Sequence, residues 1–196
     1  VFGAVPDGLY LTIGLLVPLS AVLLYGTANI LLPVRWALLA TALLVFSEHF
    51  IRWSMEIFPT SVGLVFFLAV LYTATRTLYG SAELWTVGLL LAVSLATVFT
   101  HQMSTAAVIV FLAIAAGVTS TALLAGSGSA QPERMRRAVA LSGVFLVTTV
   151  TAVASWSVTP FSGEAFLWRE LNVIRENAFQ AGFLNLAGGS GLTENL

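Results

Sequence analysis

The sequence of 196 residues contains no cysteine and no lysine, and only 9% of its residues are charged. Without cysteine the chain has no disulfides, no thiolate metal ligands and no cysteine nucleophile. A net charge of −1 excludes the basic surface of a nucleic-acid-binding protein, so no nucleic-acid partner is expected. Histidine occurs only at His49 and His101 and aspartate only at Asp7, and no phosphate-binding loop or hydrolase motif surrounds them.

The remaining composition is strongly apolar. Hydrophobic residues make up 58% of the chain, and the mean hydropathy is +0.96. Each bilayer crossing takes roughly 20 apolar residues, so a chain of this length holds about six. We predict an all-α fold, a polytopic transmembrane helical bundle with a C-terminal interfacial amphipathic helix. The predicted spans are 8–25, 30–47, 60–75, 84–99, 105–125 and 138–158.

Polar and glycine-containing segments predict the links between spans. A turn is expected at Gly26–Asn29, and a tight antiparallel hairpin at Thr100–Ser104. The segment Gly126–Arg137 (GSGSAQPERMRR) is predicted to be a flexible charged linker.

The pattern changes after the sixth predicted span. Residues 1–158 are predicted to form the transmembrane domain, and residues 159–196 an outward-side tail. In the tail, apolar residues recur at helical spacing over 164–180, with charged residues between them. This pattern is typical of a helix that lies on a membrane surface.

The arginines predict the orientation of the bundle. Alternating six spans places five of them on one side, namely Arg35, Arg76, Arg134, Arg136 and Arg137. Among the short loops, the opposite side receives only Arg52. Because basic residues favour the cytoplasmic side, the arginine-rich loops are predicted to be cytoplasmic.

Two polar stretches then face outward together. The first is Ser47–Pro59 (SEHFIRWSMEIFP) and the second is Thr100–Ser104 (THQMS). They come from different hairpins, so they can form one composite site. The candidate substrate-binding residues are Glu48, His49, Arg52, Glu56, His101 and Gln102.

The chemistry of these residues leaves alternatives open. On a helix, Glu48, Arg52 and Glu56 share a face and can form an ordinary surface ion pair. Alternatively, Arg52 binds a phosphate, while a glutamate orients it, binds a metal or accepts a proton. His101 is expected to hydrogen-bond a backbone carbonyl or a ligand. No metal-ligand set is predicted, and a divalent metal stays an open alternative.

Two segments resemble a known family. The segment Arg35–Arg76 looks like the early helices of GT-C membrane glycosyltransferases, in the branch of protein-mannosyltransferases and arabinose-transferase-like enzymes. The matching positions are Arg52, Glu56 and Pro59 before an apolar run that ends at Arg76. The hairpin LATVFTHQMSTAAVIV is similar to a family helix that ends in Thr-His, here Thr100 and His101.

The resemblance implies an activity. Such enzymes use a polyprenyl-phosphate carrier, which is held in the membrane lipid, as the sugar donor. They transfer the sugar to an acceptor on the outer face of a prokaryotic plasma membrane. Arg52, His101 and Gln102 would contact the carrier phosphate or the sugar. The family's catalytic acid lies in an outward loop expected upstream of Val1, because the chain begins without a methionine and is expected to be a fragment. Asp7 is a catalytic candidate by position alone, since no family motif surrounds it.

Three other functions compete with this one. A transporter or permease subunit would carry ionisable residues and broken helices near mid-membrane, and the spans have few of either. An O-antigen polymerase or ligase shares outward polar loops but has a longer outward loop rich in arginine and histidine. A purely structural membrane subunit requires no site at all.

Overall fold

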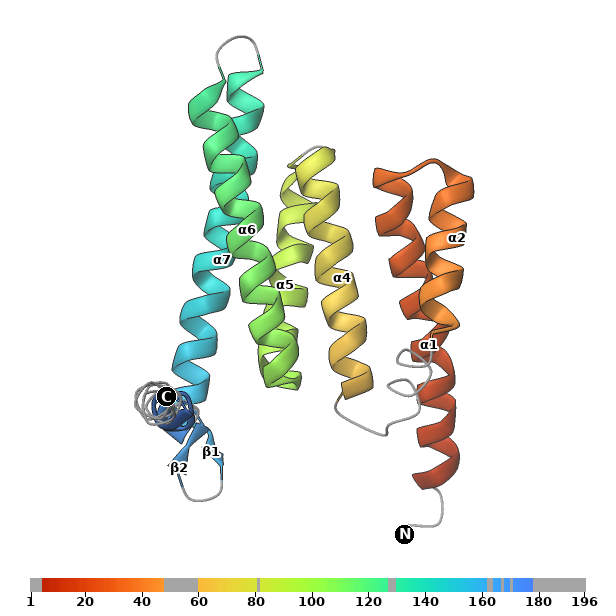
Figure 1. Cartoon of the computed structure of the whole chain (residues 1–196), viewed down its shortest axis with the longest axis vertical. Helices are drawn as coiled ribbons and strands as arrows, with labels where there is room; N and C mark the ends of the chain where they lie inside the picture. The colour runs from red at the N-terminus through yellow and green to blue at the C-terminus, as the bar shows by residue number, and fades with distance from the viewer. Residues whose placement is uncertain are drawn as a thin grey trace, which may run out of the picture. The chain divides into compact units, whose positions relative to one another are not determined.

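The structure is a computed structural model (Figure 1), and it describes residues 5–47, 60–80, 82–126, 130–161, 164–166, 168–169 and 171–177. Apart from one pair of two-residue strands, the elements with defined bounds in these ranges are helices. They are α1 (Val5–Leu31), α2 (Val34–Val45), α4 (Thr60–Tyr79), α5 (Leu84–Thr100), α6 (Gln102–Ala125) and α7 (Gln131–Val158). The chain divides into two compact units, residues 1–151 and residues 152–196.

Three helices are long and apolar enough to cross a membrane. Among the described residues, these segments are Val62–Tyr79, Gln102–Ala125 and Gln131–Val158. Shorter apolar helices cover Pro18–Leu31, Val34–Val45 and Leu84–Thr100. The predicted helical membrane class agrees with these three helices, while the number of six spans remains a prediction.

Large apolar side chains on the outside of α6 fit a lipid environment. Val110, Ile114 and Val118 lie four residues apart and are 59%, 60% and 58% exposed. Together they form an apolar stripe along one face of the helix. An exposed apolar stripe of this kind marks a surface that contacts another protein or a membrane.

The first predicted turn is wrong. Gly26–Asn29 is helical, because α1 continues to Leu31. The chain reverses instead at Leu32 and Pro33, and Pro33 is the N-cap of α2. Gly and Asn lower helix propensity only modestly, whereas proline both lacks an N–H and disfavours helix in the residue before it.

Two later boundaries also differ from the prediction. The helix α7 begins at Gln131, so the second half of the predicted linker Gly126–Arg137 is helical. In the tail, Glu164 and Ala165 form strand β2 and not the start of a helix. Helical residues follow at 166, 168–169 and 171–177, and the rest of the predicted 164–180 helix lies outside the described residues.

The core of residues 1–151 lies among α4, α5, α6 and the first part of α7. It is built from small and branched side chains, namely Val70, Ala74, Leu90, Val108, Leu112, Ala115, Ala116, Leu141 and Val144. The helix α4 occupies the centre of this arrangement, in contact with α1, α5 and α6 (Figure 1). Small side chains allow the helix backbones to approach closely, as is common between membrane helices.

Three buried threonines of α4 and α5 satisfy their hydroxyl groups within their own helices. Thr73 donates to the Ala69 carbonyl at 2.7 Å, Thr77 to the Thr73 carbonyl at 2.9 Å and Thr97 to the Val93 carbonyl at 2.8 Å. Because these three hydroxyls bond one turn back, their side chains pack in the apolar core without an unpaired donor.

Two close contacts define the two ends of this unit. A Cβ placed on Gly26 of α1 would lie 3.0 Å from the Tyr72 ring of α4, so the C-terminal halves of these helices are neighbours. A Cβ on Gly63 in the first turn of α4 would lie 2.7 Å from Cβ of His101. We call the end that holds His101 the histidine end and the opposite end the arginine end.

The second unit contains a small hairpin after α7. Strands β1 (Pro160–Phe161) and β2 (Glu164–Ala165) pair antiparallel, with Pro160 opposite Ala165. The backbone N–H of Phe166 donates to the Thr159 carbonyl at 3.1 Å. The Phe166 ring packs edge-on against Trp156, with ring centroids 5.6 Å apart.

Candidate functional site

His101 is the single residue between α5 and α6, and it caps both helices. At the end of α5, its backbone N–H donates to the Thr97 carbonyl at 3.1 Å. At the start of α6, its Nδ1 atom accepts the backbone N–H of Ser104 at 3.2 Å and lies 2.9 Å from the Ser104 hydroxyl. In this bond the imidazole accepts from a backbone amide, whereas the predicted bond to a backbone carbonyl or a ligand would use the other ring nitrogen and stays a prediction.

The cap fixes the protonation state of the ring. Because Nδ1 accepts a hydrogen bond, the ring is neutral and carries its proton on Nε2. Burial lowers the pKa of His101 below its ordinary value of 6.5 by desolvation, which favours the same neutral form. The Nε2–H group is then a donor suited to a sugar hydroxyl or a phosphate oxygen.

The backbone of the link is held from inside the bundle by Thr105. Its buried hydroxyl lies 3.0 Å from the Thr97 carbonyl and 2.9 Å from the His101 carbonyl, close enough to donate to both. This places a side chain of α6 on the last turn of α5. The two helices are thereby joined on both sides of His101.

Gly63 brings the first turn of α4 against this link. An added Cβ would lie 2.7 Å from Cβ of His101 and 2.8 Å from the Ser104 hydroxyl oxygen, closer than real Cβ atoms approach. Only glycine leaves room for this contact. The start of α4 and the α5–α6 link therefore form one packed surface at the histidine end.

Four of the predicted site residues (Glu48, His49, Arg52 and Glu56) lie outside the described residues. The described chain on either side of them ends at Ser47 after α2 and resumes at Thr60 in α4. α2 runs back along α1 after the Pro33 turn, so it leads toward the histidine end, where α4 begins (Figure 1). The described chain therefore heads toward this end before the stretch and resumes at it.

The remaining predicted residues are on helices at this same end. Gln102 is the first residue of α6 and is half-buried, next to His101. Asp7 lies in the first turn of α1. In the part of the chain that the structure describes, no three histidine, aspartate or glutamate side chains come together as a metal site.

The arginine end contains a polar network that the sequence analysis missed. Arg137 of α7 donates to the Leu78 carbonyl at 3.0 Å and to the Gly80 carbonyl, at the end of α4. Its Nε lies 3.3 Å from Glu133, which also accepts the backbone N–H of Ala82 at 3.3 Å. The spacing of Glu133 and Arg137 within PERMRR, one helical turn apart, was the available signal.

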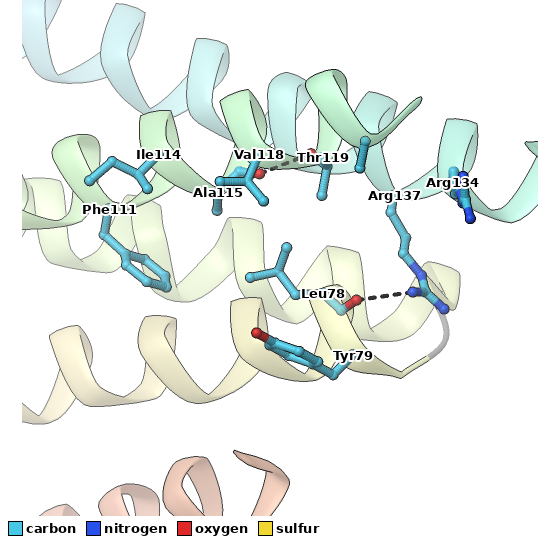
Figure 2. Close-up of a pocket in the computed structure, with 10 residues that line it drawn as sticks. Leu78, Tyr79, Phe111, Ile114, Ala115, Val118, Thr119, Arg134 and Arg137 are labelled. Carbon is cyan, nitrogen blue, oxygen red and sulfur yellow. Dashed lines mark hydrogen bonds between the residues drawn. The ribbon is translucent and has the colours of Figure 1, made fainter. Parts of the chain in front are cut away.

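A pocket of about 390 Å³ lies beside this network, within residues 1–151 (Figure 2). Leu78 and Tyr79 of α4 form one wall, and Phe111 and Val118 of α6 contribute to the other. Arg134 and Arg137 of α7 line the same pocket. Figure 2 shows the Arg137 side chain reaching across to the Leu78 carbonyl, with Arg134 beside it.

The other arginines of this end are placed on helix termini or stack on tryptophan. Arg76 lies 5.4 Å from the Trp85 ring centroid, and the Trp85 indole N–H donates to Glu83 at 2.7 Å. Arg35, in the first turn of α2, lies 5.7 Å from the ring centroid of Trp36. Tryptophan is enriched at membrane interfaces, where arginine also gathers.

Comparison with known proteins gives no match: no family model, no curated protein and no solved structure is similar to this chain.

Proposed function

We propose that this chain is part of a polytopic membrane glycosyltransferase that transfers a sugar from a polyprenyl-phosphate donor to an acceptor on the outer face of the membrane. Two lines of argument support the proposal. The first is the resemblance of Arg35–Arg76 and of the His101 hairpin to GT-C enzymes. The second is the geometry of the histidine end.

In this proposal the chain crosses the membrane six times. The three long apolar helices supply three crossings, and α1, α2 and α5 supply the others. At about 1.5 Å per residue, the 17 residues of α5 span roughly 26 Å, close to the thickness of the hydrocarbon core. The 12 residues of α2 are shorter, and local thinning of the bilayer accommodates such a helix.

The orientation follows from the distribution of arginine. Arg76 lies in the last turn of α4, and Arg134, Arg136 and Arg137 lie in the first turns of α7. The hydrogen bonds from Arg137 to the Leu78 and Gly80 carbonyls hold the start of α7 beside the end of α4, so these arginines lie at one end of the bundle. If this end is cytoplasmic by the positive-inside rule, the histidine end faces outward, where lipid-linked sugars are used.

The single observation that carries the proposal is the packing of Gly63 against His101. It places the start of α4 beside the α5–α6 link. Pro59 directly precedes α4 in the sequence, so the stretch with Arg52 joins the bundle next to His101. In this arrangement Arg52 binds the carrier phosphate, while Nε2–H of His101 and the Gln102 amide bind the sugar or phosphate oxygens.

The test is sugar transfer by the full-length protein in membranes. A labelled polyprenyl-phosphate sugar is supplied, and incorporation into acceptor is compared among Arg52→Ala, His101→Asn and wild type. Asn retains the helix cap but lacks the Nε2 donor. Loss of one charge-assisted phosphate contact is expected to lower transfer about tenfold or more, at about 1.5–3 kcal/mol.

Met103→Ala is the matched control, since Met103 lies two residues from His101 in the first turn of α6 and is 73% exposed. It is expected to retain wild-type transfer and membrane insertion. The proposal fails if wild-type membranes show no transfer from any polyprenyl-phosphate sugar. If purified protein in vesicles instead moves a solute across the bilayer, the transporter interpretation replaces it.

A further inference from the structure

The pocket at the arginine end has the polarity of a phospholipid. Its apolar wall, from Phe111 to Val118, lies within an apolar helix long enough to cross a membrane. Its arginines lie beyond the last residue of that helix, Ala125, in the first turns of α7. The pocket lining is therefore apolar towards the interior of the bundle and carries guanidinium groups towards its end. A phospholipid has the same order of groups, with an apolar acyl chain followed by a charged phosphate.

Two arginines line the pocket, and they differ in how they are engaged. Arg137 donates to Leu78, Gly80 and Glu133, so its guanidinium is largely committed to the helix ends. Arg134 is half-buried, and its guanidinium makes no hydrogen bond or ion pair with any residue in the described part of the chain. Holding an unpaired cation beside an apolar wall costs free energy unless an anion pairs with it.

Local acids do not supply that anion. Glu133 is the acidic residue in the first turn of α7, and it is already bonded to Arg137 and to the backbone N–H of Ala82. The Arg134 guanidinium lies instead over Gly126, where an added Cβ would lie 1.5 Å from its Nη1 atom. Glycine at the C-cap of α6 thus makes the space that Arg134 occupies.

We propose that this pocket binds an anionic glycerophospholipid, with its phosphate on Arg134 and one acyl chain along the α6 wall. Basic pockets between membrane helices on the cytoplasmic side recognise such head groups. The planar guanidinium suits a phosphodiester, and the half-buried position strengthens the contact relative to open water. The proposal is independent of sugar transfer and goes beyond it.

The test measures lipid retained by the purified full-length protein. Protein is equilibrated in mixed micelles with equal amounts of phosphatidylglycerol and phosphatidylcholine, and bound lipids are counted by native mass spectrometry. Wild type is expected to retain phosphatidylglycerol preferentially. Arg134→Gln is expected to lower that retention about tenfold, as loss of a charge-assisted contact predicts.

Arg136→Gln is the charge-matched control. Arg136 lies two residues away on α7, is exposed and lines a different pocket with Met135 and Val139. Its retention is expected to stay near wild type. Equal loss in both variants would mean general attraction to the basic surface and would overturn the proposal, as would no loss in Arg134→Gln.

A second pair of variants tests the acyl-chain wall. Val118→Trp fills the pocket, whereas Val110→Trp changes an equally exposed position on α6 that does not line it. Only the first is expected to lower phosphatidylglycerol retention, while the unfolding temperatures of both stay alike. If neither variant lowers retention, no acyl chain occupies this wall and the proposal is wrong.

Competition distinguishes the sources of phosphate. Inorganic phosphate carries the charge without a chain and is expected not to displace the lipid. Displacement by it would identify a free-phosphate site. Preferential displacement by polyprenyl phosphate would identify a carrier site. Either result would overturn the assignment to a glycerophospholipid.

Discussion

His101 is a residue whose structural role depends on its charge. As the N-cap of α6 it must be neutral, because a protonated Nδ1 would face the Ser104 N–H as a second donor. The pKa of His101 is lowered by burial. A lowered pKa means that the folded protein binds this proton less readily than the unfolded chain. Its contribution to stability is therefore complete above about pH 6.5 and declines as the pH falls further.

This dependence can be measured with a non-titrating cap. Lowering the pH from about 7.5 to 5 should lower the unfolding midpoint of wild type in detergent more than that of His101→Asn. Intrinsic tryptophan fluorescence follows the transition. Using the difference between the two proteins cancels the contribution of His49, which both contain. Identical pH profiles would show that the cap does not titrate in this range.

Gly63 is the second residue with a specific role. Gly63→Ala should destabilise the protein by about 1–3 kcal/mol, because the methyl group would overlap His101 and Ser104. Gly117→Ala is the matched control, since nothing lies within 4 Å of its added Cβ. That variant should be neutral or more stable by about 0.5–1 kcal/mol, owing to better helix propensity. Unfolding in detergent separates the two, and equal stability would refute the close contact.

Among helices and links, the Arg137 network joins elements distant in sequence. Arg137→Gln removes the donors to Leu78 and Gly80 and should release the α4–α5 link from α7, at a cost of about 1–3 kcal/mol. Hydrogen exchange of the backbone amide of Ala82 should accelerate, because Glu133 loses the partner that orients it. Arg136→Gln, on the exposed side of α7, should leave that exchange unchanged. An equal effect of both variants would point to charge and not to the hydrogen bonds.

The presence of the helices was easier to predict from the sequence than the residues at which they begin and end. Long apolar runs predicted α4, α5 and α6, because burying a helix backbone in hydrocarbon requires continuous internal hydrogen bonds. The same requirement made Gly26–Asn29 a false turn, since a weak helix former remains helical when its N–H has no water to bond. Between Gly26 and Val34, only Pro33 lacks that N–H, and the turn is there.

The contacts that build the ends of the bundle were not predictable in the same way. Gly63 and His101 are far apart in sequence, as are Arg137 and Leu78. Each residue type is individually unremarkable in a membrane helix. Their significance comes from which helices are neighbours, and periodicity gives the apolar face of one helix but not its partner. Hence the hairpin at His101 was predicted, and its packing against α4 was not.

At the scale of the whole molecule, the absence of cysteine allows a direct test of sidedness. Single-cysteine variants at Met103 and at Gln131 would place one thiol at each end of the bundle. A membrane-impermeant maleimide added to intact cells should label Met103→Cys, and label Gln131→Cys only after permeabilisation. Labelling of both from outside would contradict the six-crossing arrangement, and the reverse pattern would invert the bundle.

The single-residue link at His101 has a mechanical consequence. One residue provides only one pair of soft backbone torsions, and here both adjoining helices are hydrogen-bonded to it. The α5–α6 hairpin therefore lacks a hinge of its own and must tilt as a rigid lever. A displacement of one end of the hairpin would therefore displace the other end as well. A substrate that shifts the His101 imidazole on binding would also shift the opposite ends of α5 and α6.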